Sequence, residues 1–290
     1  MKKIFIGAIL FCSSLYFSQT VKELNFNTNV PDSENNYVAV PREEEGGGYG
    51  FGYVYFDEYA GYTYKIIGSL KEENGKLKVI ESYDQKVGSQ IQRIENLGYK
   101  TAIIPASMVK LFGYPAEPDW LHNYKSDASE NEKSLSRASV MNGARFSQLA
   151  IPKLLKLYDA NYRTPKLFFE LAFAHNVLKD FAKAEKITSE AIKSKAADDL
   201  VLKEHVFALL NQSKISDAER FIESNMKNYK TESYKAESLM NLIAYSNHLN
   251  QKSVAKKWLG IIKQEIKSPQ FQQNIQKLEQ HINSNDSTSK

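Results

Sequence analysis

The sequence feature that most constrains the fold is an alanine that recurs through the C-terminal half of the chain. Ala150, Ala184 and Ala218 lie 34 residues apart, and Ala255 follows at an interval of 37. Each alanine follows an apolar segment and a short polar break, and each opens a second, amphipathic segment. Two helices of about a dozen residues and two turns fill roughly 34 residues, and a small side chain lets paired helices approach closely. One pair cannot bury its apolar face, so the spacing predicts helix pairs that stack on one another.

Residues 131–264 resemble tetratricopeptide repeats over nearly half of the chain. The copy from 168 to 196 carries the matches to the family's Leu-Gly/Ala, Tyr/Phe, Ala and Ala positions, which are Leu171-Ala172, Phe181, Ala184 and Ala191. The proline that closes most repeats of the family is missing, and the third interval has three extra residues around 229–235. Pro269 opens a final amphipathic segment that suits a capping helix. The resemblance implies an α-α superhelical solenoid over residues 119–283, and the polar residues 284–290 predict a disordered tail.

The preceding part of the chain predicts a small antiparallel β module over residues 37–115. Tyrosine and phenylalanine alternate with glycine and valine from Tyr49 to Tyr55, which is the period of a strand. Asn74-Gly75 is typical of a hairpin turn. We expect about four strands, at 49–55, 62–70, 76–81 and 99–104. Two prolines within 114–120 mark the boundary to the helices, so the fold class is α+β, and residues 20–36 are expected to have little fixed structure.

The glycines and tyrosines of this module allow more than one interpretation. The glycine cluster 46–52 lacks the Gly-Lys-Ser/Thr ending of a P-loop and leads into a strand, so it does not predict a phosphate site. The tyrosines favour packing of the sheet, because aromatic residues are ordinary in strands. The alternative is a stacking platform for glycans or peptidoglycan, formed by Tyr49, Tyr53, Tyr55, Tyr62 and Tyr64.

Residues 1–20 have the pattern of a secretory signal peptide. Lys2 and Lys3 precede an apolar run from Ile4 to Phe11, and small polar residues follow. We therefore expect an exported protein, periplasmic or extracellular. Cys12 raises the alternative of a lipid anchor, but Phe11 stands where lipoprotein signals have a small residue. No later segment reaches the length of a membrane span, so no integral membrane segment is expected in the mature chain.

The charge balance argues against a nucleic-acid partner. The chain has 38 basic and 34 acidic residues, and loss of Lys2 and Lys3 with the signal leaves a net charge near +2. A nucleic-acid-binding domain usually has a basic face and a pI above about 9, whereas the pI of this chain is 8.8. The charge balance therefore predicts no nucleic-acid partner, and the resemblance to tetratricopeptide repeats implies a protein or peptide partner instead.

Motifs for catalysis are absent from the sequence. The five histidines do not form His-Glu-x-x-His or another metal-ligand spacing, and there is no Gly-x-Ser-x-Gly elbow. His175 and His205 fall on helices where packing is the simple explanation. We therefore expect no metal, no cofactor and no enzymatic activity. A hydrolase stays open only through a cluster of His122 with Asp119 or Glu117.

The resemblance to tetratricopeptide repeats places a binding groove on the first helix of each pair. The corresponding positions are Phe169, Phe173, Asn176, Lys203, Phe207, Leu210, Met240, Ala244 and Asn247, with Leu135, Ser139 and Asn142 in the weaker first copy. Apolar anchors with asparagines suit an extended peptide, because an amide both donates to and accepts from a peptide backbone. The alternative is that these residues only pack between helices. The preferred hypothesis is a non-enzymatic interaction scaffold of the bacterial cell envelope.

Overall fold

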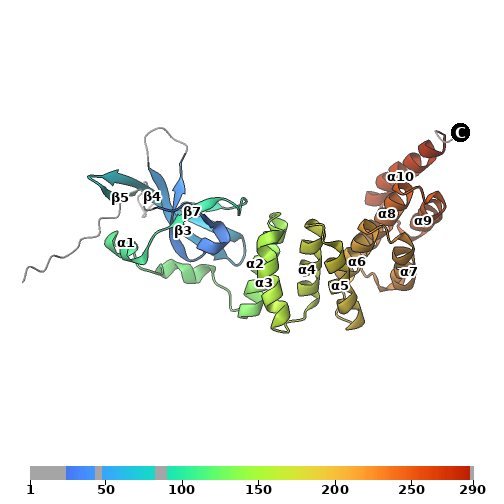
Figure 1. The fold of residues 1–290 in the computed structure, drawn as a ribbon, viewed down its shortest axis with the longest axis horizontal. Helices are drawn as coiled ribbons and strands as arrows, with labels where there is room; N and C mark the ends of the chain where they lie inside the picture. Colours follow the sequence, from blue (N-terminus) through green and yellow to red (C-terminus); the bar gives the residue numbers. More distant parts are fainter. Residues whose placement is uncertain (1–23, 43–47, 82–89, 288–290) are drawn as a thin grey trace, which may run out of the picture. The chain divides into compact units, whose positions relative to one another are not determined.

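The computed structural model describes residues 24–42, 48–81 and 90–287. The chain divides into two compact units, with the boundary between Lys125 and Ser126. The first contains an antiparallel sheet and the second is helical (Figure 1). The chain is therefore α+β, as predicted. The expected signal segment 1–20, with Cys12, lies outside the described residues.

The sheet of the first unit has seven described strands, all paired antiparallel. They are β1 (Thr28–Asn29), β2 (Asn36–Pro41), β3 (Tyr49–Asp57), β4 (Gly61–Glu73), β5 (Lys76–Glu81), β6 (Gln90–Arg93) and β7 (Lys100–Ile103). Their order is β1-β7-β2-β3-β4-β5, and β6 pairs with the first part of β4. The four expected strands are present as β3, β4, β5 and β7. The sheet is larger than expected because β1, β2 and β6 carry weak or mixed patterns.

Residues 24–36 are built into this unit, which corrects the expectation of little fixed structure there. A short 3-10 helix, η2 (Val30–Ser33), follows β1, and both Val30 and Ser33 are buried. The amide of Val30 donates to the carbonyl of Leu97 over 3.3 Å. The polar composition did not reveal this packing, because few apolar residues in the segment make it, among them Phe26, Val30 and Pro31.

One face of the sheet is covered by an aromatic core. Strand residues Tyr37, Phe51, Tyr53 and Tyr55 are buried there against Phe112, Tyr114, Trp120 and Tyr124, in the segment from α1 (Ala106–Leu111) through the 3-10 helix η3 (Asp119–Tyr124). The Trp120 ring lies 5.2 Å from that of Tyr55 and 5.7 Å from that of Tyr53, both edge to face. Residues 119–124 therefore belong to the sheet unit, and the helical unit begins later than the expected residue 119.

The second unit consists of helices in consecutive antiparallel pairs. They are α2 (Glu130–Gly143), α3 (Ser147–Asp159), α4 (Pro165–Val177), α5 (Phe181–Lys193), α6 (Asp199–Asn211), α7 (Ile215–Asn225), α8 (Glu232–His248), α9 (Lys252–Glu265) and α10 (Pro269–Ser287). The recurring alanines lie early in the second helix of each pair, and all four are fully buried. None of the described helices has the length and apolar character needed to cross a membrane.

The turns inside the pairs repeat with the same period as the alanines. The positive-φ residues Arg145, Lys179, Ser213 and Asn250 each follow a first helix, at intervals of 34, 34 and 37. After each of them an amide reaches back to close the turn, as Asp180 does to the carbonyl of His175 over 2.8 Å. The longer third interval contains the extra 3-10 helix η4 (Met226–Asn228), and Asp199 accepts hydrogen bonds from the amides of Lys230 and Thr231 after it.

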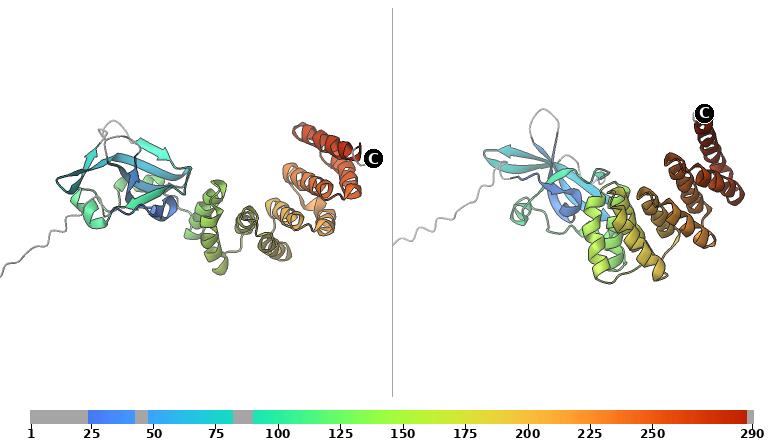
Figure 2. Two further views of the ribbon diagram at one scale, coloured as in Figure 1. Left: turned by 45° about the horizontal axis from the view of Figure 1, so that its top comes forward. Right: turned by 45° about the vertical axis from the view of Figure 1, so that its right-hand side comes forward.

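The first helices of successive pairs pack on one another. Contacts join α2 to α4, α4 to α6 and α6 to α8, whereas the main neighbours of α3, α5, α7 and α9 are first helices and, for α9, also α10. Figure 2 shows the pairs following one another in chain order. The last helix, α10, continues through Ser287, so residues 284–287 are helical where a disordered tail was expected; residues 288–290 are not described.

Candidate functional site

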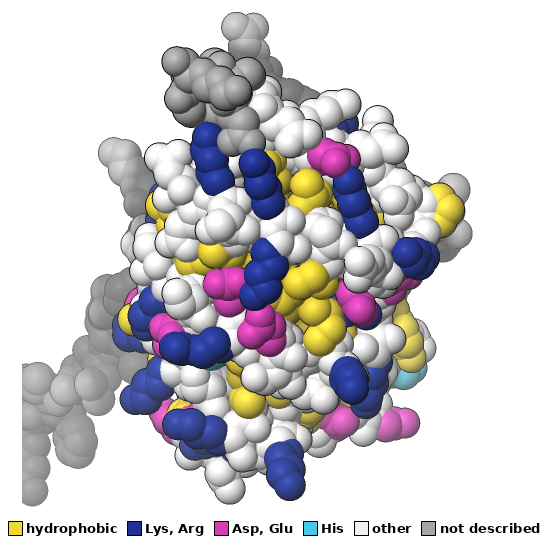
Figure 3. All heavy atoms as spheres, turned by 90° about the vertical axis from the view of Figure 1, so that its right-hand side faces the viewer, with side chains coloured by type: hydrophobic (Ala, Val, Ile, Leu, Met, Phe, Trp, Pro, Cys, Tyr) yellow, Lys and Arg dark blue, Asp and Glu magenta, His cyan; other side chains and the backbone are white. Residues whose placement is uncertain are grey.

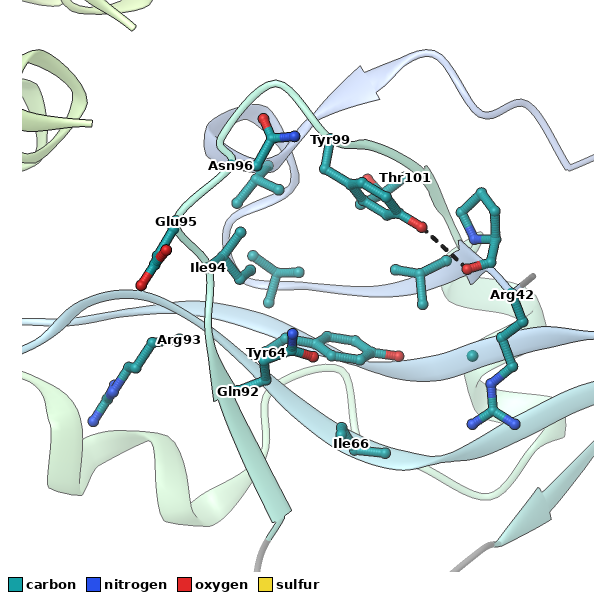
Figure 4. A pocket seen from close by; sticks show the side chains of 15 residues that line it. Arg42, Tyr64, Ile66, Gln92, Arg93, Ile94, Glu95, Asn96, Tyr99 and Thr101 are labelled. Carbon is teal, nitrogen blue, oxygen red and sulfur yellow. Dashed lines mark hydrogen bonds between the residues drawn. The ribbon is translucent and has the colours of Figure 1, made fainter. Parts of the chain in front are cut away.

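A cavity of about 650 Å³ lies on the face of the sheet opposite the aromatic core (Figure 4). Its floor is formed by strand residues with side chains on this face: Val40, Gly50, Val54, Tyr64 and Ile66. The connector 94–99 joins β6, beside β4, to β7, beside β2, and so crosses the face over β3. Six extended residues reach about 20 Å, which is about the width of the four strand spacings between β6 and β7. The hollow lies between this connector and the sheet.

Two glycines of β3 create the room for Tyr64. A Cβ atom on Gly52 would stand 2.5 Å from Tyr64 Cε2, and one on Gly50 would stand 3.5 Å from the Tyr64 hydroxyl. The ring therefore lies along the glycine side of β3, where any larger side chain would displace it. This explains the alternation of glycine with aromatic residues: the aromatic side builds the core and the glycine side receives a ring from β4.

Polar groups gather at one end of the cavity. The Tyr64 hydroxyl is buried and has no hydrogen-bond partner among the described residues, and burial raises its pKa while the nearby Arg42 guanidinium opposes that rise. A Cβ on Gly50 would lie 3.6 Å from Arg42 Nε and 3.5 Å from the Tyr64 hydroxyl, so these two polar groups are close neighbours on either side of Gly50. The Tyr99 hydroxyl donates to the carbonyl of Pro41 over 3.1 Å at this end (Figure 4).

The opposite end of the cavity has a different character. Arg93 forms an ion pair with the buried carboxylate of Asp57 at 2.8 Å and also donates to the Thr63 hydroxyl. Its charge is thus committed to the sheet. Glu95 stands beside it on the connector with an exposed carboxylate. An anion is therefore favoured at the end with Arg42 and disfavoured at the end with Glu95.

The proposed tyrosine platform is not on the surface. Tyr53 and Tyr55 are buried in the aromatic core and Tyr62 is buried on the other side, so none of the three offers a free ring face. Tyr49 packs on Phe26 with ring centroids 4.9 Å apart, and Tyr64 forms the cavity floor. The residues Arg42, Gln92, Asn96 and Tyr99 were missed by sequence reasoning. Gly50 and Gly52 are a sequence signal for this hollow, but the sequence analysis took them only as part of the strand pattern.

In the helical unit, the water-facing stripe of α4 is largely apolar. Residues on its other sides are buried, and the stripe left over consists of Lys166, Phe169, Phe173 and Val177, spaced three or four apart. The Phe169 and Phe173 rings lie 5.9 Å apart, and Val177 is 45% exposed. A solvent-facing stripe of a helix is normally polar, so this one is unusual.

The corresponding stripe of α6 continues the apolar surface with one basic residue. It consists of Leu200, Lys203, Phe207 and Asn211. Lys203 Nζ lies 3.2 Å from both Glu204 and Glu237 carboxylates. Burial alone would lower the pKa of Lys203, but the two carboxylates raise it above its ordinary value. Lys203 is therefore charged and already paired within the protein.

Five of the twelve predicted groove residues are buried, namely Leu135, Asn142, Asn176, Leu210 and Asn247. Leu210 is 1% exposed and packs in the core of the C-terminal helices. Asn176 donates to the backbone carbonyl of Glu204 at 3.2 Å and to its carboxylate at 2.8 Å. Asn247 is also buried, at the base of a hollow between α8 and α10. Met240 lines a neighbouring hollow of about 450 Å³ against α10. The structure thus brings Phe169 and Phe173 together on α4, places Phe207 on the adjacent α6, and engages Asn176 between helices.

The asparagines of the first helices serve a repeated contact between pairs. Asn142 donates to the carbonyl and the carboxylate of Glu170, at 3.0 and 2.7 Å, as Asn176 does to Glu204. Both partners follow by 28 residues. In the next copy the same two positions hold Leu210 and Ser238. Asn142 and Asn176 therefore make the same contact between the first helices of successive pairs.

The histidines considered for catalysis do not form a site. His175 and His205 are buried, as expected for helix packing. His122 is exposed and its Nδ1 contacts the carbonyl of Asp119, while the exposed Glu117 pairs with Lys125 at 2.6 Å. Within the described ranges, no three of His, Cys, Asp and Glu gather in a way that could hold a metal ion.

On the face shown in Figure 3, basic and acidic side chains are interspersed and apolar patches lie between them. Such a surface matches the small net charge of the chain. No protein-family model, no curated protein and no solved structure matches this chain.

Proposed function

We propose that the helical unit is a solenoid of the tetratricopeptide type, and that its first helices bind a segment of a partner protein. The chain would then be a non-enzymatic interaction protein. The 34-residue period of alanines and turns supports this proposal, as does the packing of first helix on first helix. Helices that touch their successive neighbours lie on the shorter, inner arc of a stacked array, where an extended ligand contacts several pairs at once.

The observation that carries the proposal is the apolar stripe on α4 and α6. Phe169, Phe173 and Phe207 are half-buried, whereas the residues directly before and after each of them are buried in the core. Contiguous apolar side chains at the surface mark interaction sites more often than chance. Because α4 and α6 pack side by side, the stripes form one continuous surface, with Val177 and Leu200 at its margins.

The occupant that fits this surface is a peptide segment with apolar anchors. Aromatic residues at successive helical turns form pockets for anchors spaced along an extended or helical ligand. Lys166 stands exposed at one end of the α4 stripe and favours an acidic residue beside the anchors. Lys203, held by two carboxylates, adds little net charge.

The test is site-specific photo-crosslinking in the native host. A photoreactive benzoyl-phenylalanine replaces Phe173 in one variant and Phe207 in another, and replaces Leu155 in the control. Leu155 is an exposed apolar residue on α3, at 38% exposure. It therefore resembles the stripe residues in its apolar side chain but lies outside the stripe. We expect both stripe positions to capture the same protein, through one segment of it, and Leu155 to capture none of it.

A second pair of variants tests the binding energy. Phe173→Ser with Phe207→Ser should abolish capture by the purified partner segment, while Leu155→Ser leaves it unchanged. Thermal unfolding of each variant controls for damage to the fold. Equal binding by the double variant and the wild type would rule out the stripe as the site.

We also infer a place in the cell envelope for this function, from the sequence of residues 1–20. Fractionation of the host with an antibody to the chain tests it. A protein found wholly in the cytoplasmic fraction would exclude this compartment.

A further inference from the structure

We infer that the cavity of the sheet unit is a binding site for a small amphipathic carboxylate, oriented with its acid group toward Arg42. This site is separate from the helical surface proposed above, and it rests on different residues. The cavity volume of about 650 Å³ lies within the range of ligand sites, about 300–1,000 Å³.

The middle of the cavity suits the apolar body of such a ligand. Its lining there consists of aliphatic side chains from the sheet, η2 and the connector: Val30, Val40, Val54, Ile66 and Ile94. The flat face of Tyr64 completes the floor. Its ring can lie against β3 because Gly50 and Gly52 have no side chains there. An alkyl chain or a flat ring in this space would exchange water for apolar contacts.

The Arg42 end of the cavity supplies hydrogen-bond donors for an anion. The guanidinium carries several N–H donors and no acceptor, and the Tyr64 hydroxyl has a proton to donate. That hydroxyl is buried and without a described partner, which is costly unless a ligand or solvent accepts from it. Donors from two neighbouring residues at this end suit the two oxygens of a carboxylate.

The other end of the cavity sets the orientation. Arg93 is neutralised by Asp57, and the exposed Glu95 carboxylate would repel a second anion. A ligand with one acid group therefore places it beside Arg42 and leaves its apolar end near Ile94. Figure 4 shows these two ends on opposite sides of the Tyr64 ring.

The experiment is a calorimetric titration of the full chain with four probes. They are decanoate, the neutral 1-decanol, decylamine and acetate. We expect decanoate to bind about tenfold more tightly than decanol, because a charge-assisted hydrogen bond is worth roughly one decade of affinity. Decylamine should bind more weakly than decanol, and acetate should not bind measurably, since it lacks the apolar body.

Two variants separate the head group from the body. Arg42→Gln should bring decanoate down to the affinity of decanol and leave decanol unchanged. Tyr64→Phe keeps the ring over the glycines and should cost decanoate several-fold. Lys71→Gln is the matched control, because it removes an exposed cation on β4 away from the cavity lining. Thermal unfolding checks each variant, and Arg42 is exposed, so its replacement should leave the fold intact.

Amide chemical shifts locate the site. Decanoate should move the resonances of Gln92, Asn96 and Gly50, with the helical unit unchanged. Shifts confined to α4 and α6 would overturn the assignment and instead reveal non-specific binding to the apolar stripe. Equal affinity of decanoate and decanol, no binding of either, or an unchanged preference in Arg42→Gln would also overturn it.

Discussion

The stability of the helical unit should depend on the protonation of His205. This side chain is 7% exposed on α6. Its Nδ1 lies 2.7 Å from the Thr188 hydroxyl. The centroid of the Phe221 ring lies 4.4 Å from that of the imidazole, with the two rings tilted by 60°. Burial lowers the pKa of His205 to about 4; Glu185 raises it somewhat and Lys214 lowers it. The imidazole is therefore neutral in the folded protein at every pH above about 4.

The magnitude follows from the difference between the folded and unfolded pKa values. An unfolded chain protonates this histidine at pH 6.5, the ordinary value, and the folded protein does so only near pH 4. Each pKa unit corresponds to about 1.36 kcal/mol, so the difference is worth about 3 kcal/mol. Because the folded pKa is the lower one, this stability is present above pH 6.5 and is lost as pH falls toward 4.

The assay compares urea unfolding of wild type and His205→Gln by circular dichroism between pH 7.5 and pH 4. At pH 7.5 the variant should be less stable by about 1 kcal/mol, because the buried contact between the imidazole and the Thr188 hydroxyl is lost. At pH 4 it should be more stable than wild type by about 2 kcal/mol, since glutamine takes up no proton. The two curves should cross near pH 6, by about one unit either way.

His122→Gln is the control, because it makes the same replacement at an exposed histidine. Comparing variants cancels the titration of the many acidic residues. A constant difference between wild type and His205→Gln over the whole range would refute the reasoning, and so would the same pH dependence in His122→Gln.

Three further predictions concern packing, each measured by urea unfolding. Asn176→Ala should lower the free energy of unfolding by about 2 kcal/mol, because it leaves the buried Glu204 carboxylate without one of its hydrogen-bond donors. The double variant Asn176→Leu with Glu204→Ser, which copies Leu210 and Ser238, should recover at least half of that loss. No recovery would contradict the equivalence of the two residue pairs. Gly52→Ala should lower the free energy of unfolding by about 2 kcal/mol or more, because the new Cβ would lie 2.2 Å from Lys65 O. Gly260→Ala in α9 has open space and should raise that free energy by about 0.5–1 kcal/mol. Equal effects of the two substitutions would refute the close approach at Gly52. Trp120→Ala should cost about 3 kcal/mol in the sheet unit, against less than about 0.5 for Leu111→Ala at 82% exposure, and a mild effect of Trp120→Ala would show that η3 is not part of this core.

Local patterns carried the prediction of the secondary structure. The recurring alanines marked every helix pair, and the Tyr-Gly alternation marked β3. In both cases the helix or strand pattern itself arises from residues only a few positions apart in the sequence. Strands β1, β2 and β6 were missed because their burial depends on partners far along the sequence, such as Thr28 opposite Thr101. The boundary at 119 was misplaced for the same reason: Trp120 packs on strands some 65 residues earlier in the chain.

The candidate groove shows where sequence spacing stops being informative. Phe173, Asn176 and Phe207 all occupy first-helix positions, yet Asn176 turns toward the next pair and bonds Glu204, while Phe173 stays at the surface. One position along a helix turns a side chain by about 100°. Which side is covered is decided by the neighbouring helix, whose position the period alone does not supply.

From its residues alone, this chain specifies two kinds of structure, an aromatic-rich sheet and a set of recurring helix pairs, because propensity and local patterning act over short distances. The cavity depends on the tertiary structure. It exists because β6 and β7 lie on opposite sides of β3, so that the connector 94–99 crosses that strand, while the pairing of β2, β3 and β4 brings Arg42 near Tyr64. Those residues are far apart in sequence, and only the pairing of the strands places them together.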